Sequence, residues 1–406
     1  MKSEYVMLRF RGIITSMIQR SAHRRDVVRL IERNPVVALL GARQVGKTTL
    51  AHEIARRRRG PARLFDLEHP SDRATLADPI RILGALRGLV VLDEIQNLPE
   101  IFPVLRVLAD RRNAPAHFLV LGSASESLLR QSSESLAGRI GFHELGPLAL
   151  DETGPASLET LWLRGGFPRS FVAGGDDDSL RWRKDFMRTF LQRDLPQLGV
   201  TIPAATLARF WSMLAHLHGQ IWNASRIASG FGVAHTTVRR WLDLLCATFV
   251  VRKLQPWHEN LSKRQVKAPK VFVADTGLLH ALHDVPSIER LEGHPIVGPS
   301  WESFGVETVV RRLGARREQC FFWATHQGAE LDLLVVAGGR RLGFEFKRTS
   351  APKLTRSMRT ALADLKLERL DVVHAGSHEF PMADRVRAVP LSRVLDLIDP
   401  LERKKR

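Results

Sequence analysis

The stretch of sequence that decides the fold is Gly41-Ala42-Arg43-Gln44-Val45-Gly46-Lys47-Thr48. It fills the P-loop pattern, in which two glycines let the backbone turn successive N–H groups toward the phosphates of a nucleotide. The apolar run 35–40 before it predicts a buried parallel strand, and residues 49–58 after it predict a helix. A glycine turn with a chance Lys-Thr pair would not explain this strand and helix. We therefore expect ATP and Mg²⁺ to bind here, with Lys47 at the outer phosphates and the Thr48 hydroxyl at the metal. The expected nucleotide-binding residues are Gly41, Ala42, Arg43, Gln44, Val45, Gly46, Lys47, Thr48 and Thr49.

A second strand end carries the carboxylates that hydrolysis needs. The apolar run 88–92 ends in Asp93-Glu94. We expect Asp93 to lie at the magnesium ion and Glu94 to activate the attacking water, although such a pair could also only begin the next helix. A further strand at 117–121 leads to Ser123, which we expect to touch the γ-phosphate or the water, unless it only forms a turn.

The rhythm of the first third of the chain predicts the fold class. Short apolar strands at 36–40, 63–66, 89–92 and 118–121 alternate with helical stretches. This alternation is typical of an α/β fold with a parallel, doubly wound sheet, here that of a P-loop NTPase. Ligands of such sheets lie at the carboxyl ends of the strands, where all three motifs fall.

Composition points to a polyanionic partner. The chain has 406 residues, 61 Lys and Arg against 43 Asp and Glu, and a net charge of +18, which favours nucleic acid. An arginine-rich proteome would also produce this charge. No apolar stretch has membrane-spanning length, and the two cysteines, Cys246 and Cys320, lack metal-site spacing. We expect a cytoplasmic protein without a membrane partner.

Residues 205–285 predict a winged helix-turn-helix. Asn223 can cap a short helix, Gly230-Phe231-Gly232-Val233 forms the turn, and 235–246 forms a second helix with one apolar stripe. Strands at 249–254 and 270–274 would form the wing. Such helices bind the major groove of DNA, but winged helices also bind proteins, so both partners stay open. The expected DNA-contacting residues are Thr236, Thr237, Arg239, Arg240, Lys253, Lys263 and Arg264.

The last domain carries acidic residues among apolar ones. A predicted hairpin at 331–347 contains Asp332, Glu345 and Lys347, and Glu302 lies on a preceding predicted helix. Glu345 and Lys347 are two residues apart and so share one face of a strand. The four residues have the composition of a magnesium nuclease site, with Asp332 and Glu345 as metal ligands and Lys347 beside the attacking hydroxide. A salt-bridged hairpin is the alternative.

Three further motifs, SLAGR at 135–139, GGFP at 165–168 and VADTGLL at 273–279, give the chain a family resemblance. It resembles the prokaryotic AAA+-type ATPases that carry a C-terminal domain of unknown function. The resemblance implies an AAA+ module, a winged helix and a C-terminal domain similar to PD-(D/E)xK nucleases. It also implies that Arg139 or Arg193 is the transition-state arginine, supplied within the subunit or to a neighbour. The usual Pro-Asp pair of such nucleases is missing, which leaves cleavage open.

Together these patterns predict a DNA-binding ATPase that couples magnesium-dependent ATP hydrolysis to remodelling or processing of duplex, single-stranded or branched DNA. Because AAA+ proteins usually place an arginine at a neighbour's nucleotide, we expect a homo-oligomer such as a ring. The alternative is a nucleotide-gated signalling scaffold that binds a protein and has an inert nuclease-like domain. The expected units are an N-terminal helical segment (1–26), the ATPase core (27–145), a helical lid (146–204), the winged helix-turn-helix (205–285), the nuclease-like domain (286–400) and a basic tail (401–406).

Overall fold

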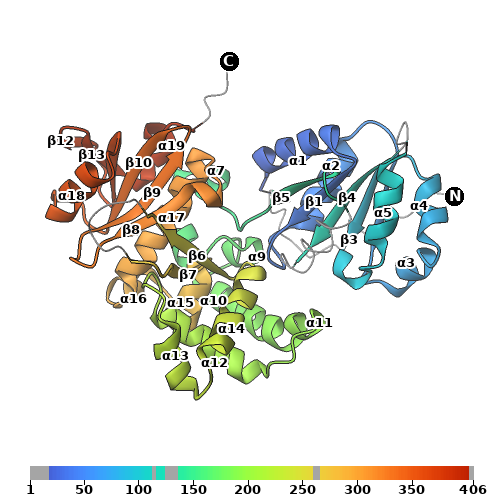
Figure 1. Ribbon diagram of the computed structural model, residues 1–406, viewed down its shortest axis with the longest axis horizontal. Helices are drawn as coiled ribbons and strands as arrows, with labels where there is room; N and C mark the ends of the chain where they lie inside the picture. Colours follow the sequence, from blue (N-terminus) through green and yellow to red (C-terminus); the bar gives the residue numbers. More distant parts are fainter. Residues whose placement is uncertain (1–17, 112–115, 124–135, 259–265, 402–406) are drawn as a thin grey trace.

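The computed structural model describes residues 18–111, 116–123, 136–258 and 266–401. Figure 1 shows the first sheet with α1 to α5 around it, the second sheet opposite, and α10 to α14 gathered below them. The first sheet has the strand order β2-β3-β4-β1-β5, and every pair in it is parallel. Its strands are β1 (Val36–Leu40), β2 (Ala62–Asp66), β3 (Gly88–Asp93), β4 (Ala116–Gly122) and β5 (Ile140–Glu144). The predicted parallel α/β sheet is therefore confirmed.

The fifth strand, β5, escaped sequence analysis. It pairs with β1 at the edge of the sheet, and its residues are mostly exposed or half-buried, including the exposed Phe142. An edge strand needs no continuous apolar run because only part of it faces the core. The sequence of β5 therefore lacks the signal that marked the other four strands.

Helices cover both faces of this sheet. Strand residues alternate between two apolar clusters: Val37 and Leu39 pack with the helices α1 and α2, whereas Val36 and Ala38 pack with α4 and α5. This burial on both faces explains the continuous apolar sequence of β1. Helix α1 also crosses the expected boundary at residue 26 and belongs to the core. The helices are α1 (Ser21–Arg33), α2 (Lys47–Arg57), α3 (Pro70–Thr75), α4 (Pro79–Ala85) and α5 (Ile101–Ala109), with a 3₁₀ turn at Ile95–Asn97.

A helical region follows and contains two of the family-specific motifs. The backbone N–H of Gly166 donates to the Asp275 carboxylate over 2.7 Å, and Asp275 also caps α15 through the Leu278 N–H at 3.0 Å. A Cβ on Gly277 would lie 2.1 Å from the Arg164 carbonyl oxygen. The GGFP and VADTGLL motifs thus pack directly against each other, although they lie about a hundred residues apart in the sequence. The elements are α7 (Leu150–Thr153), a 3₁₀ turn (Pro155–Ser157), α8 (Leu158–Arg164), α9 (Pro168–Phe171), α10 (Asp176–Thr189), a π-helical turn (Phe190–Asp194), α11 (Leu195–Gln197), α12 (Ala204–His216) and α15 (Thr276–Leu282).

Two helices and a hairpin occupy the region expected to form a winged helix. Asn223 accepts a hydrogen bond from the Arg226 N–H at 3.0 Å, which confirms the predicted helix cap. The strands β6 and β7 form an antiparallel pair. Strand β6 begins at Val251, two residues later than expected. The elements are α13 (Ala224–Phe231), α14 (His235–Ala247), β6 (Val251–Pro256) and β7 (Lys270–Val273).

The second sheet contains the predicted C-terminal hairpin and more. Strands β9 and β10 pair around Gly338-Gly339, as predicted. Strand β6 also pairs with β8, so the order is β12-β13-β11-β10-β9-β8-β6-β7, and the sheet runs across the boundary expected at residue 285. The remaining elements are α16 (Ile288–Glu292), α17 (Val297–Leu313), a 3₁₀ turn (Arg317–Gln319), β8 (Cys320–Ala324), β9 (Glu330–Ala337), β10 (Arg340–Lys347), α18 (Arg356–Asp364), β11 (Arg369–His374), β12 (Phe380–Ala383), β13 (Val386–Pro390), a 3₁₀ turn (Leu391–Arg393) and α19 (Val394–Leu397).

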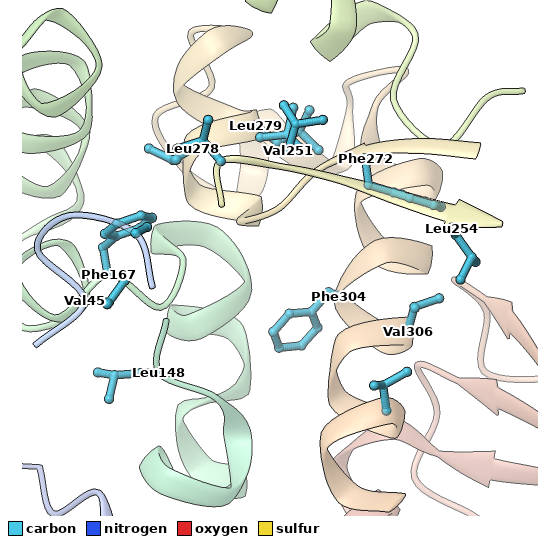
Figure 2. Packing of buried hydrophobic residues seen from close by; sticks show 14 of the residues in the cluster. Val45, Leu148, Phe167, Val251, Leu254, Phe272, Leu278, Leu279, Phe304 and Val306 are labelled. Carbon is cyan, nitrogen blue, oxygen red and sulfur yellow. The ribbon is translucent and has the colours of Figure 1, made fainter. Parts of the chain in front are cut away.

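One apolar cluster joins these regions. It includes Val45 of the P-loop, Phe167 of GGFP, Phe272 of β7 and Phe304 of α17, which Figure 2 displays from close by. These segments are distant in sequence but pack in one dense core. A displacement of one segment therefore shifts the side chains of the others. Among the described helices, none combines the length and the apolar character needed to cross a bilayer.

Candidate functional site

The P-loop lies between the buried strand β1 and the amino end of α2. Gln44 (φ 66°) and Gly46 (φ 98°) both have left-handed backbone conformations, and a Cβ on Gly41 would lie 2.2 Å from the Leu145 carbonyl oxygen. Ala42 and Val45 are buried and fasten the loop to the core, whereas Thr48 and Thr49 are exposed. Alternating backbone conformations ahead of a helix point several N–H groups to one spot, where the helix dipole also favours an anion.

Lys47 lies inside this loop. Its Nζ donates to the carbonyl oxygens of Gly41 (2.9 Å) and Ala42 (3.0 Å) and to the Ser123 hydroxyl (3.2 Å). The lysine is buried, and this burial lowers its pKa to about 8, although Glu94 and Asp93 act in the opposite direction. Its positive charge is therefore poorly compensated by the chain.

The carboxylates of β3 meet the P-loop as expected. The Thr48 hydroxyl donates to Asp93 Oδ2 over 2.6 Å, and burial raises the pKa of Asp93. Ser123, at the end of β4, donates to Glu94 Oε2 over 3.1 Å, and Gln96 donates to the same carboxylate. Thr48 and Asp93 together fit Mg²⁺, a hard cation that takes few protein oxygens and keeps several waters. When bound, such an ion would neutralise phosphate charge.

A ring of charges beside the P-loop was not predicted. Arg43 donates to Asp194, and its second nitrogen lies 3.2 Å from Glu68 Oε1. Arg193 donates to the same Glu68 oxygen over 2.5 Å. Asp194 ends a π-helical turn, a geometry that is rare and frequently found at functional sites. The motifs FDLEHPSDR and LQRDL contain Glu68 and Asp194, but nothing in either sequence shows that they meet Arg43.

The two candidate arginines lie in different places. Arg193 is joined to the P-loop through Glu68. Arg139 precedes β5, and its carbonyl oxygen accepts from Val36, the first residue of β1. It therefore lies at the amino edge of the sheet, about 16 Å along β1 from the P-loop at roughly 3.3 Å per residue. There it pairs with Asp110 over 2.5 Å and is half-buried. Arg139 cannot reach the nucleotide-binding loop of its own subunit.

A buried network fastens the P-loop to the rest of the molecule. Arg20 donates to the carbonyl oxygen of Val45 (3.1 Å) and, through two other nitrogens, to Glu152 (2.7 and 2.9 Å). Arg311 of α17 donates to the same Glu152 carboxylate over 2.9 Å. One buried glutamate thus joins the loop to the helix that also carries Glu302. Sequence analysis missed all three residues because they come from three distant segments.

The residues predicted for the helix-turn-helix divide into two groups. Thr236, Arg239 and Arg240 lie exposed on α14 and Thr237 is half-buried; among the described residues the two arginines form no ion pair. Lys253 instead forms an ion pair with Asp243 over 2.5 Å. Lys263 and Arg264 lie outside the described residues.

The four predicted C-terminal residues come together. Lys347 lies 2.7 Å from Glu345 and 3.6 Å from Asp332, whose carboxylate also accepts the Phe346 N–H over 2.9 Å. Glu302 reaches the same place from α17. We call Glu302, Asp332 and Glu345 the carboxylate cluster. All three are largely buried, and this burial raises the pKa of Glu302 and Glu345.

A fifth residue, Lys270 of β7, enters the carboxylate cluster. Its Nζ lies 3.2 Å from Glu302 and 3.9 Å from Asp332. Burial would lower the pKa of Lys270, but these carboxylates raise it. In the described part of the chain, no three His, Cys, Asp or Glu side chains are arranged to hold a metal. Asp332 and Glu345 were expected to bind a metal; as arranged here they do not fit one, because their oxygens face lysines.

Comparison with known proteins divides the chain into three matched regions. An AAA domain matches residues 33–154, and two domains of unknown function, DUF8612 and DUF4143, match 155–289 and 297–394. The second region spans both the expected lid and the expected winged helix. The first region contains the P-loop, Asp93 at the end of β3 and Glu94 directly after it.

Related chains and structures were also found. Protein Rv2008c of Mycobacterium tuberculosis and protein Mb2031c of Mycobacterium bovis, both described as uncharacterized, are each 49% identical over 367 residues, covering 90% of this chain and 82% of theirs. The Walker-type ATPase PABY2304 of Pyrococcus abyssi is a remote structural match, with 16% identity, a TM-score of 0.49 and coverage of 68% of this chain and 99% of that one. The RuvB branch migration motor of Thermotoga maritima is more remote, with 19% identity, a TM-score of 0.30 and coverage of 58% and 90%. By its sequence identity to the mycobacterial proteins and its matched AAA domain, the chain belongs to an AAA-type P-loop ATPase family.

Proposed function

We propose that the chain is a magnesium-dependent ATPase of the AAA+ type that binds DNA and couples ATP hydrolysis to remodelling or processing of that DNA. One observation carries the ATPase proposal: Ser123 lies within hydrogen-bond distance of both Lys47 and Glu94, the groups for the phosphate and for the water. Phosphoryl transfer depends mostly on positioning and charge neutralisation, which these residues supply. Thr48 and Asp93 would hold the magnesium ion.

The catalytic arginine is proposed to come from a neighbouring subunit. Arg139 is half-buried and lies at the edge of the sheet far from its own P-loop, so only a homo-oligomer, such as a ring, can bring it to a nucleotide. Arg193, the other candidate, lies near the P-loop of its own subunit, because Glu68 accepts hydrogen bonds from both Arg193 and Arg43. It would therefore act on the nucleotide of its own subunit. An arginine supplied from a neighbour would couple hydrolysis to assembly.

Phosphate release with ATP and Mg²⁺ tests the ATPase. We expect turnover by the wild type, and loss of both nucleotide binding and turnover in Lys47→Ala. Mixing tests the neighbour's arginine: Lys47→Ala and Arg139→Ala subunits are each inactive, but their mixture regains activity where Arg139 of one faces an intact P-loop of the other. A Lys47→Ala chain that binds ATP as well as the wild type would end the proposal.

DNA binding is proposed for α14. Arg239 and Arg240 are exposed and, among the described residues, unpaired, so their guanidinium groups are available to phosphates. Lys253 contributes less because Asp243 already compensates its charge. We expect Arg239→Ala and Arg240→Ala to weaken duplex binding, and each lost phosphate contact to reduce the salt slope by about 1. Arg359→Ala, an equally exposed arginine on α18, is the matched control.

The second candidate function is a nucleotide-gated scaffold that binds a protein and has an inert C-terminal domain. The pairing of the carboxylate cluster with lysines favours the inert C-terminal domain. Stimulation of ATP hydrolysis by duplex, single-stranded or branched DNA separates the two functions, since a scaffold is indifferent to all three. Long incubation of DNA with Mg²⁺ or Mn²⁺ tests cleavage, which Asp332→Ala and Lys347→Ala must abolish if the cluster is responsible.

A further inference from the structure

The carboxylate cluster already contains cations that the chain itself supplies. Asp332 stands between two lysines: its Oδ1 lies 3.9 Å from Lys270 Nζ, and its Oδ2 lies 3.6 Å from Lys347 Nζ. Lys270 also donates to Glu302 over 3.2 Å. A divalent ion shared by these carboxylates would need the oxygens that the two ammonium groups now face.

Charge explains why a metal and both lysines do not fit together. If all were ionised, three carboxylates and two ammonium groups would carry one net negative charge. Because burial and Asp332 raise the pKa of Glu302 to about 7 and that of Glu345 to about 8, the cluster is less negative than that near neutral pH. A divalent ion would then leave at least one net positive charge in a buried place, where uncompensated charge is costly. Lys347 lies beside Glu345, as a lysine does in the predicted nuclease pattern. Lys270 is the additional cation, so it is the one that competes with a metal.

One ligand atom of the cluster is left over. Glu345 is 3% exposed, and its Oε1 has no hydrogen-bond partner among the described residues. A buried carboxylate oxygen without a donor is costly, and in native proteins such atoms call for an explanation. Neither lysine donates to this oxygen, so it is left either for a proton, because burial and Asp332 raise the pKa of Glu345 to about 8, or for a different cation.

Lys270 is held from outside the C-terminal domain. Its neighbour Val271 donates its N–H to the Gln220 carbonyl oxygen over 3.1 Å, and the Pro269 carbonyl oxygen accepts from Trp222 over 2.8 Å. Trp222 directly precedes the cap of α13. The side chain of Lys270 then passes the Phe322 ring, with Nζ 5.6 Å from its centre. The position of this ammonium group therefore depends on the segment that carries the helix-turn-helix.

We propose that Lys270 locks a latent divalent-metal site: its ammonium group takes the place of the cation, and the carboxylate cluster binds a metal only when Lys270 is removed or withdrawn. The lock lies on β7 at the base of the hairpin that follows α14. It acts in the C-terminal domain and does not depend on ATP hydrolysis.

Titration with Mn²⁺ in the absence of nucleotide tests this lock, with calorimetry and thermal unfolding as readouts. Lys270→Arg keeps the positive charge. In both the wild type and Lys270→Arg, we expect the Asp332→Asn substitution to leave Mn²⁺ binding unchanged, because the cluster holds no Mn²⁺ in either chain. The Lys270→Met chain should bind one more Mn²⁺ ion than the wild type does. It should also unfold at a higher temperature with Mn²⁺ than without it. This gain should disappear in Lys270→Met combined with Asp332→Asn.

Two results would overturn the lock. The first is a wild-type chain that binds Mn²⁺ and loses it in Asp332→Asn, because the site would then be open with Lys270 in place. The second is a folded Lys270→Met chain that gains no Mn²⁺. If Lys270→Met does not fold, Lys270→Gln replaces it under the same criteria, since glutamine removes the charge but keeps a donor for Glu302. The comparison of the wild type with Asp332→Asn needs neither variant.

Discussion

The P-loop and the carboxylate cluster each bury a lysine near carboxylates, but they hold it in opposite ways. Lys47 donates to two backbone carbonyls and one hydroxyl and, among the described residues, forms no ion pair. Burial lowers its pKa to about 8. Lys270 is equally buried, and there Glu302 and Asp332 outweigh burial and raise its pKa. The first site keeps a positive charge for a ligand, whereas the second compensates its charges internally.

This difference separates the P-loop, which can bind a ligand, from the carboxylate cluster, whose charges are already compensated by lysines of the chain. Both sites contain the same types of residue. A lysine and acidic residues mark both places in the sequence. What distinguishes them is whether the ammonium group faces carboxylates or neutral oxygens. Four predictions test that distinction, from the largest effect to the smallest.

Glu94→Gln should lower the rate of ATP hydrolysis by about 10²–10⁴-fold while nucleotide binding persists, because the amide cannot accept the proton of the water. Glu345→Gln should leave this rate unchanged, since the carboxylate cluster serves a different part of the molecule. Phosphate release and fluorescent nucleotide titration measure the two quantities. Glu100→Gln, an exposed neighbour of Glu94 in sequence, is the control. Equal losses from Glu94→Gln and Glu345→Gln would contradict the comparison.

Lys270→Met should lower the free energy of unfolding by about 3–5 kcal/mol, because it leaves buried carboxylates without their cation. Lys47→Met should change it by less than about 1 kcal/mol, because an unpaired buried ammonium group adds little net stability. Urea unfolding followed by tryptophan fluorescence provides both values. The two variants share the same replacement, so the contrast depends on the sites alone. A loss from Lys47→Met as large as that from Lys270→Met would refute our view of the P-loop.

Ser123→Ala should slow hydrolysis about tenfold and change nucleotide affinity by less than about threefold. The hydroxyl bridges Lys47 and Glu94, and each such hydrogen bond contributes about 1 kcal/mol. Single-turnover measurements with saturating ATP isolate the chemical step. Ser123→Thr keeps the hydroxyl and is expected to retain most of the rate. A loss of affinity without a loss of rate would place Ser123 at the phosphates alone.

Nucleotide affinity should fall by up to about tenfold between pH 7 and pH 9. Lys47 carries its charge below its pKa of about 8 and loses it above, so attraction for phosphate weakens as the pH rises. Asp93, Glu94 and Arg43 are the ionisable groups that act on Lys47. Equilibrium titration at constant ionic strength measures the effect. Lys47→Arg should remove the pH dependence, because arginine stays protonated throughout.

Sequence alone determined the P-loop and four of the five strands of the sheet that carries it. Residues 41–46 lie between a five-residue strand and a helix that begins at Lys47, Asp93 ends β3, and Ser123 directly follows β4. Strand, turn and helix each depend on a few neighbouring residues. Once the strands are parallel and adjacent, their carboxyl ends meet at one edge, so the site follows from local patterns.

Tertiary structure decided which charges meet. The pairing of Arg43 with Asp194, the joining of Arg20 and Arg311 by Glu152 and the entry of Lys270 into the carboxylate cluster all link segments far apart in the chain. It also placed Arg139 at the edge of the sheet opposite the P-loop. No periodicity or spacing encodes such contacts, because they depend on how helices and sheets pack across distances that local sequence does not set. Acidic and basic residues of the same types therefore form a ligand-binding site in one region and a network of internally compensated ion pairs in the other.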